Sequence, residues 1–494
     1  MGRAADVMVA WALACAAVLA LPAQAQQQAS QADALHVLDR LGYGPAPGDL
    51  AHVMQIGIDR YIDEQLHPER LALPADLAQQ LAALPSTTQS QRDLVLQFRD
   101  AQQAAKDGNE DAKAMRQASL RQLGIESGEA RIWSAARSPR QLEERMVDFW
   151  FNHFNVFIGK GLDRVLVENY EREAIRPYAM GRFRDLLGAT AHHPAMLFYL
   201  DNWQSAAPGY QPPRAAGPAA KASGLNENYA RELMELHTLG VDGGYTQQDV
   251  TELARILTGW TLAPRITTGA SIFYFDARRH DNGDKVWLGQ HMGDQGQAEG
   301  ERALDLLAMH PATAHHISFE LAQYFVADQP PPALVDRLTQ RYLASGGDIR
   351  AVLKTLFDSP EFRSPKVHDA KFKTPYDYVI SSVRAANVPL SDVRPLLGTL
   401  RQLGMPLYGC QTPDGYKNTQ EAWLNPDAIT RRIAFATALA AGRLPNAPTP
   451  PVDADALLAT LGSGISAKTR AAIAEATPEL RAPMVLGSPD FMHY

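Results

Sequence analysis

Apolar residues recur at helical spacing along most of the 494-residue chain. Leu35, Leu38 and Leu41 form one short stripe of this kind, and the turn residues at 42–45 end it. Apolar residues at helical spacing, or a composition typical of helices, also predict helices in the ranges 94–123, 141–157, 304–325 and 334–356. His193 and His310 each precede a proline, which is typical of the first residue of a helix. The pattern predicts a mainly α-helical, multi-helix globular bundle with long loops.

Strand signals are few. Residues 272–275 and 286–288 are short β-prone runs on either side of a polar loop, so we expect one small β-hairpin. The stretch 205–222 is rich in proline, alanine and glycine, which is typical of a long loop. We expect one largely helical domain over residues 26–445, or alternatively two packed helical subunits with that loop between them. Residues 446–494 are expected to form a proline-rich linker and a C-terminal tail.

The first residues have the features of a secretory signal peptide. Arg3 precedes an apolar run over residues 7–21, which is too short for a comfortable membrane span. Small residues at Ala23 and Ala25 then form an A-x-A cleavage motif. We therefore expect a leader over residues 1–25 and a periplasmic or secreted protein. No later stretch approaches the roughly 20 apolar residues that a membrane span needs.

Charge and cysteine content exclude several classes of protein. Asp and Glu outnumber Lys and Arg by 55 to 47, so the chain lacks the positive charge that binding to nucleic acid or an anionic membrane requires. Only Cys15 and Cys410 are present, which excludes a disulfide framework and a cysteine-rich metal site. Cleavage of the leader leaves Cys410 alone, most simply as a small packed side chain.

The stretch from Asn226 to Gly240 is the most informative part of the sequence. It predicts a helix that runs through His237 and that Gly240 ends. Thr246 and Asp249 then have the spacing of a capping box, which predicts the start of the next helix. Residues 242–249 resemble half of a calcium-binding loop, but the oxygen ligands of the other half are missing, which favours a glycine turn.

Three side chains of this predicted helix are candidate functional residues. His237 falls near the middle of the apolar face, where it is either a metal ligand or general base in a cleft, or a core histidine bonded to a carbonyl group. Glu232 lies on the flank of the helix, and Asn228 lies near its start.

A polar stripe crosses the aromatic helix predicted at 141–157. Arg145, Asp148, Asn152 and Asn155 fall within one narrow strip of a helix that is otherwise apolar, while His153 points elsewhere. Polar groups on a buried helix need partners. The stripe is therefore either an internal polar network or the wall of a site.

A third polar cluster occupies the loop of the expected hairpin. Its members are Asp276, Arg278, His280, Asp281 and Lys285. Adjacent acid and imidazole groups can form a general acid–base pair or part of a metal shell, although hairpin loops are also polar because they face water.

No H-E-x-x-H, Walker or G-x-S-x-G signature is present. The run NENYARELMELHTLG at 226–240 instead resembles the signature of a bacterial family, the domain of unknown function 1800. Supporting matches are LGYGP at 41–45, FWFNHF at 149–154, HDNGDK at 280–285, HPATA at 310–314 and WLN at 423–425. The resemblance implies an exported, largely helical bacterial protein without an established activity. It also implies a partner, because relatives are often encoded beside another exported, sulfatase-like family.

Two classes of function follow. The first is an exported hydrolase with a metal or acid–base site, whose candidate residues are His237, Glu232, Asn228, Asp148, Asn152, His153, His280 and Asp281. In this hypothesis the histidines at 237 and 280 bind a divalent metal or move protons, and the asparagines at 228 and 152 orient the substrate. The second is a non-catalytic scaffold or partner of a co-encoded exported protein, which predicts closed polar networks, no cleft and a sizeable exposed apolar patch.

Overall fold

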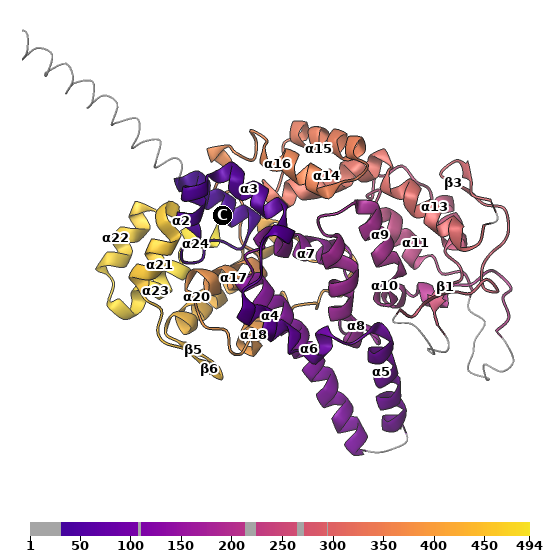
Figure 1. Cartoon of the computed structure of the whole chain (residues 1–494), viewed down its shortest axis with the longest axis horizontal. Helices are drawn as coiled ribbons and strands as arrows, with labels where there is room; N and C mark the ends of the chain where they lie inside the picture. Colours follow the sequence, from indigo (N-terminus) through magenta and orange to yellow (C-terminus); the bar gives the residue numbers. More distant parts are fainter. Residues whose placement is uncertain (1–30, 107–109, 213–223, 264–270, 294) are drawn as a thin grey trace, which may run out of the picture.

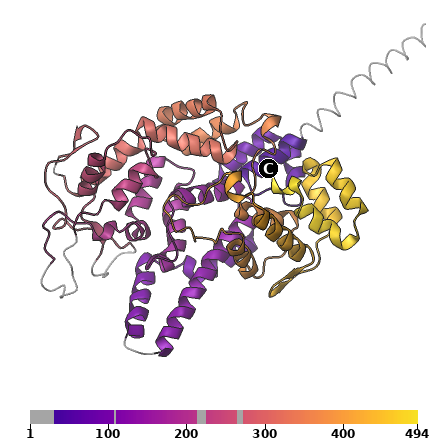
Figure 2. The same cartoon turned by 180° about the vertical axis from the view of Figure 1, so that it is seen from behind.

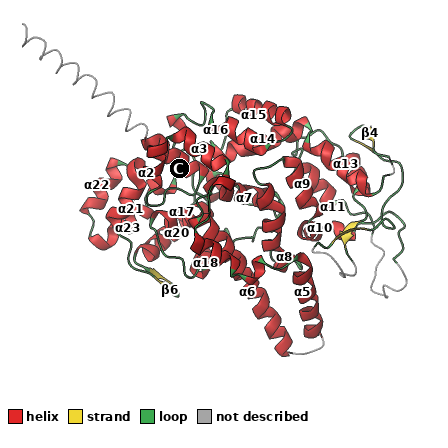
Figure 3. Cartoon of the chain, viewed as in Figure 1, coloured by secondary structure: helices red, strands yellow, loops and turns green. Residues whose placement is uncertain are grey.

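The structure is a computed structural model that describes residues 31–106, 110–212, 224–263, 271–293 and 295–494. The expected leader at 1–25 and part of the expected loop at 205–222 lie outside these ranges. Helices make up most of the described chain, and the few strands are short (Figure 3). The mainly α-helical fold predicted from the sequence is confirmed.

Helices follow one another through the whole described chain. Those of the first half are residues 31–41, α2 (Asp49–Ile56), α3 (Ile58–Leu66), α4 (Ala75–Ala82), α5 (Gln91–Lys106), α6 (Glu110–Arg137), α7 (Gln141–His153), α8 (Asp163–Tyr170), α9 (Phe183–His192), α10 (Pro194–Tyr199), α11 (Asn228–Glu235) and α12 (Gln247–Ile256). Those of the second half are α13 (Gln297–Ala308), α14 (Pro311–Phe325), α15 (Pro332–Ser345), α16 (Ile349–Phe357), α17 (Pro375–Ala385), α18 (Arg394–Gln402), α19 (Gln420–Trp423), α20 (Pro426–Ala440), α21 (Ala454–Leu461), α22 (Ala467–Glu475), α23 (Pro478–Leu486) and α24 (Pro489–Met492). Single turns of 3₁₀ helix connect several of them, at Pro68–Arg70, Pro85–Thr87, Arg176–Tyr178, Asn202–Gln204, Pro365–Val367 and Gly462–Gly464, and η3 (Glu171–Ile175) is a π-helical turn.

Local sequence signals set several helix ends. His193 and His310 are the N-caps of α10 and α14, where each side chain accepts a hydrogen bond from the main chain two residues on, as expected. The capping box of Thr246 and Asp249 starts α12, which also confirms the prediction. Helix α11 ends at Glu235, two residues earlier than expected, and the turn that follows continues to the left-handed Gly240.

The described strands form three two-stranded sheets: β1 (Trp260–Leu262) with β2 (Phe273–Phe275), β3 (Val286–Trp287) with β4 (Gln290–His291), and β5 (Arg443–Leu444) with β6 (Ala447–Pro448). The β1 and β2 strands are antiparallel, with the middle residues of both strands opposite each other. Small hairpins are present as expected, but the two β-prone runs at 272–275 and 286–288 do not pair with each other: the first pairs with β1 and the second with β4. The reason is that Leu288 and Gly289 both have positive φ, which closes a tight two-residue turn and pairs residues 286–287 with 290–291.

Buried apolar side chains form two cores. The first is built mainly from α7 to α16, and the second from α17, α18 and α20 to α24 together with parts of α4 and α6. Figures 1 and 2 show α7 between these two groups of helices. Tyr43, from the N-terminal part of the chain, belongs to the second core and lies against Tyr376. The expected loop at 205–222 does not separate the cores, because the first core contains residues on both sides of it.

Residues 446–494, the expected linker and tail, contain α21 to α24 in the structure. Leu457, Ile473 and Val485 from these helices are buried in the second core, where α23 packs on α20 and α21 (Figure 1). Beyond α24, Tyr494 pairs with Lys371 through two main-chain hydrogen bonds. Apolar residues at helical spacing therefore outweigh the proline content of this segment.

Candidate functional site

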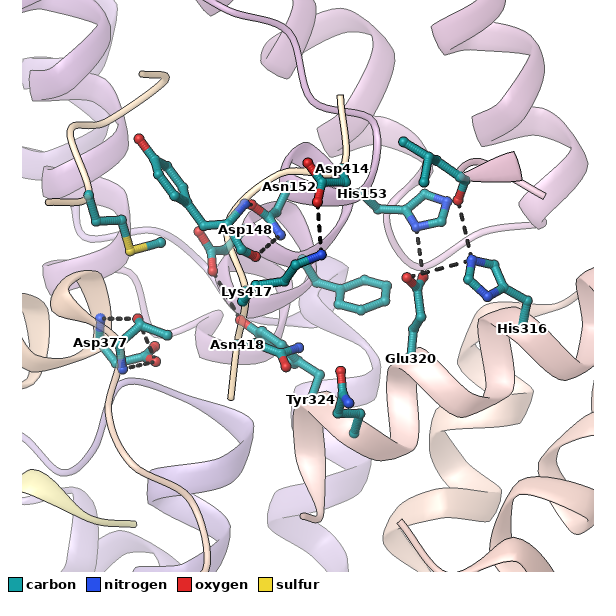
Figure 4. Close-up of a pocket in the computed structure, with 16 residues that line it drawn as sticks. Asp148, Asn152, His153, His316, Glu320, Tyr324, Asp377, Asp414, Lys417 and Asn418 are labelled. Atoms are coloured by element: carbon teal, nitrogen blue, oxygen red, sulfur yellow. Dashed lines mark hydrogen bonds and ion pairs between the residues drawn. The ribbon is translucent and has the colours of Figure 1, made fainter. Parts of the chain in front are cut away.

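A pocket of about 240 Å³ lies beside α7, where helices of the first core meet α17 of the second. Side chains from α7, α14, the start of α17 and the segment 405–418 face it (Figure 4). The lining residues are Asp148, Phe149, Asn152, His153, Leu236, His316, Glu320, Gln323, Tyr324, Thr374, Asp377, Met405, Asp414, Tyr416, Lys417 and Asn418. The polar stripe of α7 thus forms one wall of the pocket.

Asp148 is a mostly buried carboxyl group in this wall. Its Oδ1 atom lies 2.7 Å from Arg131, and its Oδ2 atom accepts a hydrogen bond of 3.1 Å from the hydroxyl group of Tyr324. Burial raises the pKa of Asp148, and the nearby Arg131 only partly opposes this effect. Asp148 therefore holds a proton to higher pH than an ordinary aspartate does.

Arg131 connects Asp148 to the structure behind the pocket. Its guanidinium group also pairs with Glu171, which starts the π-helical turn η3 and accepts a hydrogen bond of 2.8 Å from Tyr408. The Arg131 side chain is only 2% exposed and lies over the ring of Tyr376. This arrangement fixes the position of Asp148, because both carboxylates bind one rigid planar cation.

Glu320 of α14 is held by two histidines on the other side of the pocket. The Nδ1 atom of His153 lies 2.7 Å from its Oε2 atom, and the Nε2 atom of His316 lies 3.6 Å from its Oε1 atom (Figure 4). Burial alone would raise the pKa of Glu320, but His153, His316 and Lys417 outweigh it and lower the pKa. Glu320 thus stays ionised to lower pH than an ordinary glutamate does.

The contacts of His153 define its role. Its Nε2 atom lies 3.1 Å from the carbonyl oxygen of His237, while Nδ1 faces Glu320. Both ring nitrogens therefore face acceptors, and neither offers a free lone pair to a substrate. We interpret His153 as a residue that positions Glu320.

Helix α17 contributes the opposite wall through its first turn. Thr374 and Asp377 form a capping box, with the Oγ1 atom of Thr374 2.8 Å from the Oδ2 atom of Asp377. The other carboxylate oxygen of Asp377 pairs with Arg145 of α7, and both side chains are almost completely buried. This ion pair connects α7 to α17 beside the pocket.

The segment 405–418 covers the pocket and is bound to α7 by main-chain contacts. The side-chain amide of Asn152 donates to the carbonyl group of Tyr416 at 2.8 Å and accepts from its N–H group at 2.7 Å. Gly415 has a φ of 65°, and a Cβ atom there would lie 2.3 Å from the carbonyl oxygen of Asn152. Only glycine is compatible with this close approach. Lys417 and Asp414 pair at 2.8 Å on the rim.

The structure places three of the predicted candidates, Asp148, Asn152 and His153, in this one pocket. His237 lies behind the wall, 1% exposed, with its ring 5.1 Å from that of Phe154. Burial lowers the pKa of His237 well below its usual value, and His153 and His316 add to this effect.

Glu232 and Asn228 are not among the pocket residues. Glu232 is half-buried, and burial together with the neighbouring Glu235 raises its pKa. Asn228 is exposed, and its side chain donates a hydrogen bond of 3.4 Å to the carbonyl group of Leu200. Its main-chain N–H group donates to the side chain of Asn226 at 2.9 Å. These contacts hold the start of α11.

His280 and Asp281 belong to a different polar cluster, in the loop between β2 and β3. The Nδ1 atom of His280 lies 2.9 Å from the carbonyl oxygen of Thr258. Asp281 accepts two hydrogen bonds from Arg255, at 2.8 and 3.1 Å. These contacts bind the loop to α12, so the structure does not bring these residues together with the pocket by α7.

Several pocket residues were not predicted from the sequence, above all Glu320, Tyr324, Asp377 and Lys417. A signal existed for two of them. Glu320 follows His316 by four residues, which places both on one face of a helix, and Asp377 has the spacing of a capping box. Tyr324 and Lys417 carry no local signal.

The described residues include no group of three or more His, Cys, Asp or Glu side chains arranged to hold a metal ion. Within the same ranges, no helix is both long enough and apolar enough to cross a membrane.

Residues 36–493 match the profile of a family described as "Protein of unknown function (DUF1800)". The chain belongs to the DUF1800 family. The match covers nearly the whole chain and confirms the resemblance seen in the sequence. No curated protein and no solved structure shows significant similarity to this DUF1800 protein. Family membership assigns no activity to the chain.

Proposed function

We propose that this DUF1800 protein is a hydrolase that uses general acid–base catalysis in the pocket beside α7. One observation carries the proposal: two carboxyl groups of the same pocket have pKa values shifted in opposite directions. Burial raises the pKa of Asp148, while the surrounding histidines lower that of Glu320. Environments that separate two pKa values in this way supply an acid and a base at the same pH.

In the proposed reaction Glu320 is the general base and Asp148 is the general acid. Glu320 takes a proton from a water molecule, and the water oxygen bonds to the electrophilic centre of the substrate. The bond to the leaving group breaks as Asp148 gives that group its proton. Exchange with solvent then removes the proton from Glu320 and returns one to Asp148.

Neighbouring residues position these two groups. His153 and His316 hold Glu320, and Arg131 and Tyr324 hold Asp148. Both polar atoms of Asn152 bind the main chain of the segment 405–418, so its proposed role is to hold this segment rather than to contact the substrate.

A divalent metal site is the other form of the hydrolase hypothesis. The acid–base form has the better support, because two suitable carboxyl groups line one pocket in the described part of the chain. The two forms differ in their response to a chelator.

The experiment is a screen of the purified protein against chromogenic esters, amides, phosphate esters and glycosides, with and without EDTA. We expect Asp148→Asn and Glu320→Gln to lower kcat by about 100-fold or more while the protein stays folded. The matched control is Asp358→Asn at the end of α16, a half-exposed carboxylate away from the pocket, which should leave kcat unchanged. Full activity in both pocket variants, or loss of activity in EDTA with recovery on addition of metal, would contradict the proposal.

We further propose that the protein is exported and acts beside a co-encoded exported protein. The apolar run and the A-x-A motif of the first 25 residues support export. Sequencing the N-terminus of the protein from its native host tests it, and a mature chain that still starts with Met1 would refute it. Cross-linking in the same host tests the partner.

A further inference from the structure

His153, the last residue of α7, is enclosed in the wall of the pocket. Its side chain is only 3% exposed, and the centre of its ring lies 4.5 Å from that of Phe154 and 5.4 Å from that of Trp150. These aromatic neighbours hold the ring in one orientation. Both of its nitrogen atoms then face groups outside α7, and the chemistry of those groups determines how many protons the ring carries.

Both nitrogen atoms of His153 face oxygen atoms that accept hydrogen bonds. Nδ1 lies 2.7 Å from the carboxylate of Glu320, and Nε2 lies 3.1 Å from the main-chain carbonyl oxygen of His237 (Figure 4). A neutral imidazole has one N–H group and one bare nitrogen with a lone pair. In either neutral form that lone pair would point at an oxygen atom at close range, which is repulsive. The imidazolium form, with a proton on each nitrogen, satisfies both contacts at once.

A proton on Glu320 is the alternative, because a carboxyl group could donate to a neutral ring. The surroundings of Glu320 oppose it, since His153, His316 and Lys417 together outweigh burial and lower its pKa. The positive charge of the pair therefore belongs to His153, and the negative charge belongs to Glu320.

The contact with His237 joins His153 to the end of α11. Leu236 follows this helix directly and His237 comes next, so their carbonyl groups lie where the helix dipole is negative and favours a cation. The Nε2 atom of His316 lies 3.3 Å from the carbonyl oxygen of Leu236 and 3.6 Å from Glu320. One N–H group on His316 serves both of these acceptors, whereas the contacts of His153 need two.

We propose that His153 is a pH-sensitive latch, which in its doubly protonated form fastens the turn at 236–240 to Glu320 of α14. As the pH rises, the ring releases one proton to solvent and loses one of its two contacts. Leu236 of this turn lines the pocket, so opening of the latch loosens one wall of the pocket. The inference does not rest on the proposed hydrolase function.

The titratable and charged side chains around the latch come from each element packed against it. They are Glu320 and His316 of α14, His237 of the turn, Asp148 of α7, Asp377 of α17, and Asp414 and Lys417 of the segment 405–418. Within the described ranges, Glu320 is the group at ion-pair distance from His153, so its charge holds the second proton. Because the pKa of Glu320 is lowered, the latch opens on the acid side only below the usual range of a glutamate.

NMR of the full chain with ¹⁵N-labelled histidine counts the protons on each ring. We expect His153 to be an imidazolium at pH 7.5, where an unconstrained histidine is mostly neutral. His193 and His310 are internal controls and should be neutral, because the Nδ1 atom of each accepts a main-chain hydrogen bond and has to be bare. Glu320→Gln should make His153 neutral at the same pH, which also identifies its signal.

Hydrogen exchange measured by mass spectrometry tests the turn. The amides of His237 and Leu239 bond to carbonyl groups of α11, at 3.0 and 2.8 Å, so slow exchange reports on this turn. At pH 6.5 we expect these amides to exchange about fivefold faster or more in His153→Gln than in the wild type. At pH 9 the ratio should fall toward one, because the wild-type latch has then lost its second proton. The matched control is His52→Gln, a half-exposed histidine that contacts Glu64 at 3.2 Å, which should exchange like the wild type.

Three outcomes overturn the inference: a bare nitrogen on His153 at pH 7.5, an exchange ratio near one at pH 6.5, or the same ratio at both pH values. If His153→Gln does not fold, the spectra of the wild type and of Glu320→Gln decide alone. Neither measurement uses a substrate. Failure of the hydrolase proposal therefore leaves the latch intact, and a neutral His153 leaves the hydrolase to be judged by its own variants.

Discussion

Replacing Arg131 by methionine removes the cation that holds two buried carboxylates. Methionine retains the apolar stem, so the main loss is the pairing with Asp148 and Glu171. Removing one partner of a buried ion pair typically costs about 3–5 kcal/mol, because the remaining charge stays buried without compensation. We therefore expect Arg131→Met to lower the free energy of unfolding by this amount near pH 8.

The loss should depend on pH in a defined direction. The pKa of Asp148 is raised in the folded protein, so its contribution to stability is present at low pH and is lost as the pH rises through the folded-state value. Arg131 opposes this rise, and without it the pKa of Asp148 moves further up. At pH 5 more of this carboxyl group is neutral, and the difference between Arg131→Met and the wild type should shrink.

Urea unfolding monitored by tryptophan fluorescence at pH 8 and pH 5 measures both quantities. The matched control is Arg137→Met at the end of the same helix, where the arginine pairs with the exposed Asp76. Such surface pairs contribute about 0–1 kcal/mol, so the control should differ little from the wild type at either pH. A loss below about 1 kcal/mol in Arg131→Met, or a loss that is equal at both pH values, would refute the reasoning.

Three further predictions follow from the pocket and its surroundings. The pH profile of kcat/KM should be bell-shaped. Its acid limb should reflect the lowered pKa of Glu320, and its alkaline limb the raised pKa of Asp148. A profile without an alkaline limb would exclude Asp148 as the acid. Gly415→Ala should lower stability by about 1–3 kcal/mol and abolish ligand binding, measured by thermal unfolding and calorimetry, because its Cβ atom would overlap Asn152. Lys285→Met should cost about 3–5 kcal/mol in urea unfolding, because it removes the ammonium group 2.8 Å from the fully buried carboxylate of Glu299, but it should leave binding in the pocket unchanged.

Sequence periodicity predicted the helices well, because the apolar residues on the buried face of a helix recur every three to four positions in its own sequence. The stripe of Arg145, Asp148 and Asn152 on a buried helix correctly indicated that polar partners had to exist. The partners themselves could not be predicted, because they lie up to 349 residues away in the chain. Local spacing defines which face of a helix is polar, but not which other element meets that face.

The same limit explains the candidates that lie elsewhere. His280 and Asp281 were candidates because an acid and an imidazole are neighbours in sequence, but in the fold each bonds to the end of α12. Gly415 follows Asp414, a pair typical of turns, and this signal locates the turn. Glycine is required there because the turn lies against Asn152 of α7, and no pattern in the nearby sequence predicts this contact.

The membership of Tyr43 in the second core has a consequence for how the chain reaches its folded state. Its ring packs on Tyr376, so a core made mostly of late helices stays incomplete until an early segment joins it. Arg384 of α17 likewise binds the carbonyl group of Gly44 across 340 residues. Contacts this distant in sequence form slowly, because a long loop must close first. Dividing the chain between the two cores would therefore yield fragments that lack part of their own interior, and the pocket between the cores can only form late, once both ends have come together.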